Sequence, residues 1–212
     1  MTTSSPWPAI HRERKVLADD VAEVPEKAWS TPSLCRGWTV LDVLGHVVST
    51  AKLSPLGFFG RFAGSGFRFA VMAQKNAERE TAGGPAHTLA ELRAHANDSS
   101  APPGPVDSWL GEIVVHGTDI RWPLGLEHDH PVDTLIRVAE FYRKSNALIG
   151  AKNRIAGLTL TATETEWTTG AGPEVRGPLL ALVMAMTGRR AALARLTGPG
   201  LDEFATRFGK PA

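Results

Sequence analysis

Most of the first 150 residues space their apolar side chains as helices do. Apolar positions recur every three or four residues, which is the spacing of one helix face. Such stretches lie at about 8–25, 39–53, 67–80, 107–123 and 132–149. Thr39 is suited to cap the second of these helices, and Thr88 with Glu91 forms a capping-box pattern that opens a further short helix.

The pattern changes after Arg154. Residues 157–167 are rich in β-branched side chains and partly alternate, and a turn at 168–172 precedes residues 174–176, which predicts a small hairpin. An apolar helix and short helical pieces follow. We therefore predict a mainly α protein, in which residues 1–154 form a helical bundle and residues 155–212 a small α/β module of a hairpin plus helices.

Composition and charge narrow the function classes. The chain has 212 residues, 42% of them hydrophobic, which is enough to fill a core. Its 23 basic and 22 acidic residues form no long basic tract, so we expect no nucleic-acid partner. The sequence has neither a run of about 18 apolar residues nor a leader-like start, so we expect a cytoplasmic protein without a membrane partner.

Residues 57–69 stand out because they combine glycine with phenylalanine. A pocket wall or lid is the commoner use of such a segment, and contact with a membrane surface is the alternative. Gly64 and Gly66 do not form a nucleotide-binding loop, because Phe69 stands where the third glycine of that motif belongs.

Two of the predicted helices carry metal-ligand side chains among apolar neighbours. Glu112 and His116 lie one helical turn apart, Asp119 follows about one turn later, and His46 lies in the second predicted helix. Two imidazoles and a carboxylate suit Zn²⁺ or a similar divalent ion, and three protein ligands leave a position open. The alternatives are an ordinary surface pair for Glu112 and His116, and a bond to a backbone carbonyl for His46.

Two other groups compete as reactive sites. Residues 127–130, Glu-His-Asp-His, lie between a helix end and Pro131, so we expect a solvated loop and not a metal cluster. Cys35 stands beside Arg36 and could be a nucleophile, but packing near a helix start is the commoner role of a single small thiol. As the only cysteine, it excludes an internal disulfide.

Three groups of residues carry a resemblance to a known family. They are the Gly-Trp-Thr-Val-Leu-Asp-Val-Leu-Gly-His run at 37–46, the Glu-Ile-Val-Val-His-Gly-Thr-Asp-Ile run at 112–120, and a tail with Trp167, 175–177 and Thr-Gly-Arg at 187–189. In order and spacing the chain resembles the DinB-like metalloenzyme superfamily. Within it, the chain is most similar to the actinobacterial branch, the mycothiol-dependent maleylpyruvate isomerase family.

The resemblance implies a four-helix bundle with a divalent metal, usually zinc, held by His46, Glu112 and His116. A glutamate ligand points to the isomerase-like branch, because the wider superfamily often uses three histidines. Arg189 would face the site and hold a substrate carboxylate, the alternative being a cation that follows a helix C-terminus. Asp119 would orient a ligand imidazole, the alternative being a structural role. The tail is short for a full second domain, which leaves the specific isomerase activity open.

The function implied by the resemblance is a zinc-dependent enzyme that activates a low-molecular-weight thiol, mycothiol, for addition to a small electrophile. It would act as an isomerase or as an S-transferase. The alternative is a non-catalytic DinB-like binding or regulatory module with a structural or vestigial metal site. A homodimer is compatible with either function.

Overall fold

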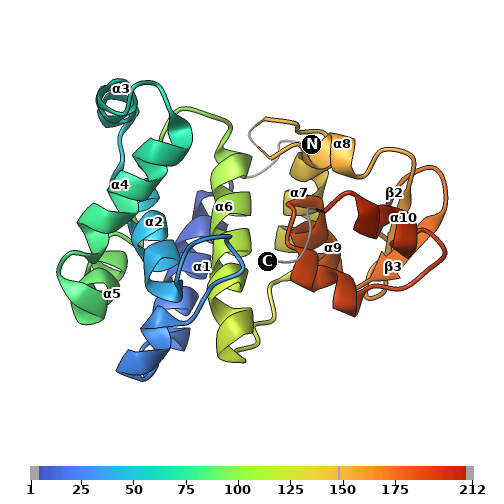
Figure 1. The fold of residues 1–212 in the computed structure, drawn as a ribbon, viewed down its shortest axis with the longest axis horizontal. Coiled ribbons are helices and arrows are strands. Elements are labelled where there is room, and N and C mark those ends of the chain that lie inside the picture. Colours follow the sequence, from blue (N-terminus) through green and yellow to red (C-terminus); the bar gives the residue numbers. More distant parts are fainter. Residues whose placement is uncertain (1–4, 148, 209–212) are drawn as a thin grey trace. The chain divides into compact units, whose positions relative to one another are not determined.

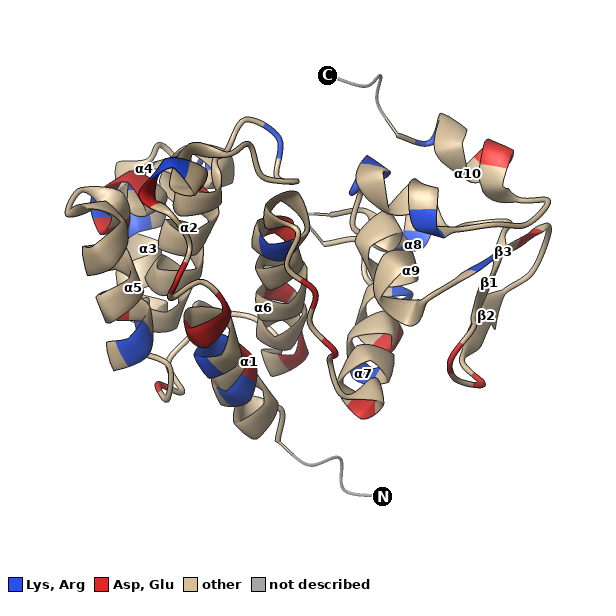
Figure 2. Cartoon of the chain, turned by 90° about the horizontal axis from the view of Figure 1, so that it is seen from below, with Lys and Arg blue, Asp and Glu red and all other residues tan. Residues whose placement is uncertain are grey.

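The computed structural model describes residues 5–147 and 149–208, which form parts of two compact units, residues 1–128 and 129–212 (Figure 1). Acidic and basic residues are interspersed along several of the helices (Figure 2). Among the described residues, none of the helices is both long enough and apolar enough to cross a bilayer.

The first unit is helical. Its helix α2 packs against α4, α5 and α6, and α1 packs against α5 and α6. This arrangement confirms the predicted helical bundle. The elements of the unit are α1 (Trp7–Asp20), a 3₁₀ helix (Glu26–Ser30), α2 (Val40–Lys52), α3 (Pro55–Gly64), α4 (Phe69–Thr81), α5 (Gly84–Ala94), α6 (Val106–Arg121) and a second 3₁₀ helix (Trp122–Leu124).

Helix α2, the central element of the first unit, has a well-specified start and a buried apolar face. Thr39 accepts a hydrogen bond from the backbone N–H of Asp42, and the Asp42 carboxylate accepts one from the N–H of Thr39, which completes a capping box. Val43, Leu44 and Val47 are fully buried. The cap and the apolar face together fix where His46 stands.

Two helices differ from the prediction. Helix α3 forms within the glycine- and phenylalanine-rich segment, where no separate helix was expected. Helix α5 begins at Gly84 and not at Thr88, and Pro85 stands in its first turn. The Thr88 hydroxyl instead donates to the carbonyls of Glu80 and Gly84, so it joins α5 to the end of α4.

The second unit combines helices with a small sheet. Its elements are α7 (Val132–Tyr142), α8 (Ala151–Arg154), β1 (Thr159–Ala162), β2 (Thr168–Gly170), β3 (Glu174–Gly177), α9 (Leu179–Met186), a 3₁₀ helix (Arg190–Arg195) and α10 (Leu201–Thr206). Strand β1 lies at the centre, antiparallel to β2 and parallel to β3. The predicted hairpin therefore has a different second arm, because residues 168–170 pair as a strand and residues 174–177 add a parallel one.

Helix α7 packs against α9, within the second unit. The compact units consequently divide between His128 and Asp129, whereas the predicted division lay at 154/155 and placed α7 in the bundle. The small α/β module after residue 154 is present as expected, and α7 covers one side of its apolar helix α9.

Candidate metal centre

His46, Glu112 and His116 converge inside the first unit. Helix α2 supplies His46 and helix α6 supplies the other two. One potential ligand atom from each residue lies within 4.8 Å of the others. The Nε2 atom of His46 is 3.7 Å from Oε1 of Glu112, and the two imidazole rings are 4.9 Å apart between centroids. Two imidazoles and a carboxylate are thus gathered at one point between two packed helices.

The Glu112 carboxylate lies in a dry environment. The residue is 8% exposed, and burial raises the pKa of its carboxyl group, an effect that His116, Thr50 and Arg14 oppose. Its Oε1 atom accepts a hydrogen bond of 2.8 Å from the Thr50 hydroxyl. A carboxylate in such surroundings requires a compensating positive charge to remain ionised.

A second carboxylate contacts the Nδ1 side of the His116 ring. The Oδ2 atom of Asp119 lies 2.9 Å from Nδ1 of His116, and the Asp119 side chain is fully buried. If Nδ1 carries the proton and donates to Asp119, Nε2 is the nitrogen whose lone pair is available to a metal. The backbone carbonyl of Asp119 also accepts from the N–H of Leu34, which holds the loop before α2 against α6.

Three further residues, which were not predicted to lie there, are next to His46, Glu112 and His116. Thr50 follows His46 by one turn of α2. This spacing of two polar side chains on an apolar helix could have indicated that Thr50 lies beside the candidate ligands. The Trp38 ring lies 5.2 Å from the His46 ring. Cys35 is half-buried, with its sulfur within 4.8 Å of ligand atoms of His116 and Asp119, and no local pattern could have placed it there.

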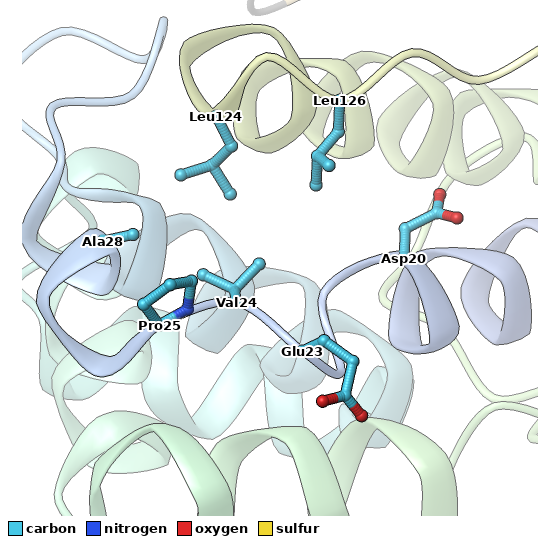
Figure 3. Close-up of a pocket in the computed structure, with 7 residues that line it drawn as sticks. All are labelled: Asp20, Glu23, Val24, Pro25, Ala28, Leu124 and Leu126. Atoms are coloured by element: carbon cyan, nitrogen blue, oxygen red, sulfur yellow. The ribbon is translucent and has the colours of Figure 1, made fainter.

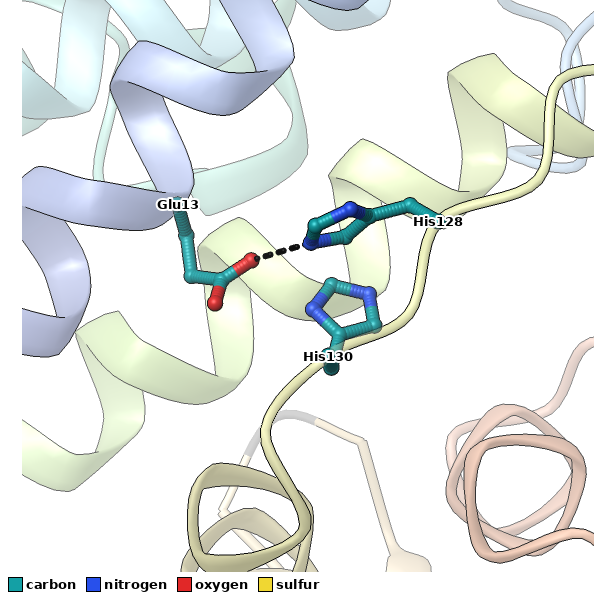
Figure 4. Close-up of side chains that lie close together, drawn as sticks. All are labelled: Glu13, His128 and His130. Atoms are coloured by element: carbon teal, nitrogen blue, oxygen red, sulfur yellow. Dashed lines mark hydrogen bonds and ion pairs between the residues drawn. The ribbon is translucent and has the colours of Figure 1, made fainter.

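The other candidates lie elsewhere. Arg189 belongs to the second unit, where it donates to the carbonyl of Thr187 at the C-terminal end of α9, so its role at the metal centre stays a prediction. The loop 127–130 is only partly solvated, because Glu127 and Asp129 are exposed whereas His128 is half-buried and His130 is buried. His128 pairs with the buried carboxylate of Glu13 at 3.1 Å (Figure 4), and His130 is only 7% exposed.

A pocket of about 210 Å³ lies within the first unit (Figure 3). Most of its wall is apolar, and of its two carboxylates Asp20 pairs with Arg121 at 2.6 Å. It contains none of the candidate metal ligands. The residues that line it are Asp20, Glu23, Val24, Pro25, Ala28, Leu124 and Leu126.

Comparison with known proteins finds a likeness for part of the first unit. Residues 10–103 match the model of the mycothiol maleylpyruvate isomerase N-terminal domain. This segment is similar to that domain. The matched segment contains His46 and the whole of α2, whereas Glu112 and His116 follow its end. No curated protein matches the chain.

Two solved structures share the fold over nearly the whole chain. One is the mycothiol-dependent maleylpyruvate isomerase, and the other is a histidine-to-alanine mutant of the same enzyme. Each is 17% identical and covers 94% of this chain and 96% of its own, with TM-scores of 0.50 and 0.52 respectively. The likeness shows that the chain, including its C-terminal part, has the fold of that isomerase.

Proposed function

We propose that the protein is a metal-dependent, thiol-using enzyme of the mycothiol-dependent maleylpyruvate isomerase type. The observation that carries the proposal is the convergence of His46, Glu112 and His116 between α2 and α6. The match of residues 10–103 to the isomerase N-terminal domain supports it. Its substrates would be a low-molecular-weight thiol, mycothiol, and a small electrophile.

The donor set fits a divalent ion. The ligand atoms of the three side chains lie close enough to share one ion, and two imidazoles with one carboxylate are a common set for zinc. The buried Glu112 carboxylate would gain the positive charge that its surroundings otherwise supply poorly. When bound, the ion would lower the pKa of a thiol at its open position and so favour the reactive thiolate.

The surrounding residues would hold these ligands in place. The Thr50 hydroxyl orients one oxygen of Glu112, and Asp119 fixes the ring of His116 and the tautomer that leaves Nε2 available. Trp38 packs against His46 and limits the rotation of its ring. Arg189 would bind a substrate carboxylate through two parallel hydrogen bonds.

The reaction then depends on the electrophile. With a conjugated cis double bond, the thiolate sulfur would add to one carbon, rotation about the new single bond would follow, and expulsion of the thiolate would restore the double bond. This sequence consumes no proton and no thiol. In an S-transferase the carbon–sulfur bond would instead remain, and a proton would be taken up at the neighbouring carbon.

The test combines zinc-loaded protein with mycothiol and maleylpyruvate and follows both the isomer ratio and the free thiol. With maleylpyruvate we expect isomerisation while the concentration of free thiol stays constant. If the enzyme is instead an S-transferase, the free thiol should be consumed when its own electrophile replaces maleylpyruvate. Activity should fall at least about a hundredfold in His46→Ala and Glu112→Gln. His87→Ala and Glu78→Gln alter exposed residues on α5 and α4 and serve as matched controls. Thiol-independent turnover, or full activity in His46→Ala, would refute the proposal.

A further inference from the structure

Large apolar side chains are exposed together on α3 and the segment that follows it. Leu56, Phe59, Phe67 and Phe69 are 85%, 59%, 72% and 37% exposed, and we call these four residues the aromatic surface. No residue of α3 is buried. Across the described part of the chain, Val132 is the only other large hydrophobic residue that is comparably exposed. A concentration of exposed apolar side chains of this kind is typical of a binding surface.

Phe67 has an unfavourable backbone for its side chain. Its φ angle is 56°, in the left-handed region that glycine adopts freely and an aromatic residue adopts with strain. Its ring lies against Phe62 but remains largely exposed, so burial within the fold offsets little of this strain. A glycine at position 67 would favour folding more than phenylalanine does. This indicates that the Phe67 ring makes a contact outside the chain.

The charged residues within the segment that carries the aromatic surface are of one sign. No acidic residue occurs between Leu53 and Ala77, whereas Arg61, Arg68 and Lys75 do. Arg61 donates to Asn76, and Arg68 and Lys75 are exposed. Aromatic rings beside cations match the interface of an anionic bilayer, where rings enter the boundary between head groups and acyl chains and cations meet lipid phosphates. A symmetric contact with a second copy would bring these cations together.

We propose that the aromatic surface docks peripherally on an anionic lipid bilayer, with Arg68 and Lys75 against the lipid phosphates. This proposal departs from the expectation that the chain has no membrane partner. That expectation rested on the absence of a spanning segment, and a helix that lies in the interface requires none.

The test is co-sedimentation of the full chain with vesicles of phosphatidylcholine, with and without phosphatidylglycerol. We expect binding to the anionic vesicles only, weakened by added salt. The Phe59→Ser/Phe67→Gly variant should bind at least about tenfold more weakly. Val132→Ser removes an exposed apolar side chain elsewhere and should bind as the wild type does. Arg68→Gln/Lys75→Gln should lose most of the salt-sensitive part of the binding.

Because Phe67→Gly relieves strain, the variant should retain its far-UV circular dichroism and its unfolding temperature. The proposal is overturned if the wild type fails to bind anionic vesicles at low salt, or binds neutral vesicles equally well. It is also overturned if the two phenylalanine substitutions leave vesicle binding unchanged. A dimer that dissociates in Phe59→Ser/Phe67→Gly, without vesicle binding by the wild type, would assign the aromatic surface to a second copy.

Discussion

Within the group of His46, Glu112 and His116, the Glu112 carboxylate is the side chain that a bound cation would stabilise most. Burial raises the pKa of its carboxyl group, and the Thr50 hydroxyl is a neutral partner. A hydrogen bond from a hydroxyl offsets only part of the cost of burying a charge. A divalent ion held by the same carboxylate and by two imidazoles would offset the rest, which is why the metal and the fold are expected to stabilise each other.

Asp119 acts through His116, so its substitution should weaken metal binding without removing a ligand. We expect Asp119→Asn to lower the affinity for zinc about 10- to 100-fold, the range typical of residues that orient a ligand imidazole. Competition with a chromophoric chelator measures this. Asp107→Asn, in the first turn of the same helix, is the control. Equal zinc affinity in Asp119→Asn and wild type would show that the 2.9 Å contact does not position His116 for a metal.

At the scale of elements, the predictable features are those that local sequence determines. The start of α2 follows from Thr39 and Asp42, which form a local capping box. Helix α3 escaped prediction because its three glycines, Gly57, Gly60 and Gly64, have low helix propensity, and none of its residues is buried. The parallel pairing of β1 with β3 escaped prediction because these strands are not consecutive in the chain, and the register between such strands depends on tertiary contacts.

Gly45 allows α2 and α4 to approach each other beside His46. A Cβ atom at this position would lie 2.9 Å from the backbone carbonyl oxygen of Ala77 and 2.6 Å from a methyl group of Thr81. A backbone atom cannot move aside as a flexible side chain can. We therefore expect Gly45→Ala to lower the free energy of unfolding by about 1–3 kcal/mol, as overpacking does.

Urea denaturation followed by circular dichroism measures that change. Gly60→Ala, on the exposed helix α3 where a Cβ meets nothing within 4 Å, is the matched control. It should leave the free energy of unfolding equal or slightly higher, since alanine favours helix. If Gly45→Ala were as stable as Gly60→Ala, α2 and α4 would not pack closely enough at Gly45 to exclude a methyl group.

At the scale of the whole molecule, the sequence predicted the fold class better than the division of the chain. The change of composition after Arg154 precedes the first strand, β1, which begins at Thr159. The assignment of α7 to the second unit depends on its packing against α9, which no local pattern of α7 reveals. The family resemblance pointed to His46, Glu112 and His116, which lie close together in the structure, and their role as metal ligands stays a prediction. The position of Cys35 was not predictable, because a loop hydrogen bond from Leu34 to α6 brings it there.

Glu140 connects α7 to the residue before β2 within the second unit. Its carboxylate accepts hydrogen bonds from Arg143 and from the indole of Trp167. Arg143, followed by Lys144 and Trp167, lowers the Glu140 pKa to about 2, against 4.5 for an ordinary glutamate. Because the folded-state pKa is depressed, the stabilisation is complete above pH 4.5 and disappears as the pH falls to about 2.

We therefore expect Glu140→Gln to be less stable than wild type at pH 7, by about 1 kcal/mol, since solvent screens this partly exposed pair. The difference should close between about pH 4.5 and pH 2. Denaturant unfolding followed by tryptophan fluorescence over this pH range measures it, with the exposed Glu166→Gln as control. A difference independent of pH would show that the Glu140 carboxylate gains nothing from its ionised form.

The most direct test of the metal centre is the zinc content of untagged protein by elemental analysis, for wild type, Glu112→Gln and the control Glu78→Gln. Three protein ligands in one place predict about one zinc per chain in the wild type and in Glu78→Gln, and little in Glu112→Gln. Addition of a low-molecular-weight thiol to the cobalt-substituted wild type should change its visible spectrum. Wild-type protein that stays free of metal after reconstitution, or Glu112→Gln that holds as much zinc as Glu78→Gln, would contradict a metal centre at His46, Glu112 and His116.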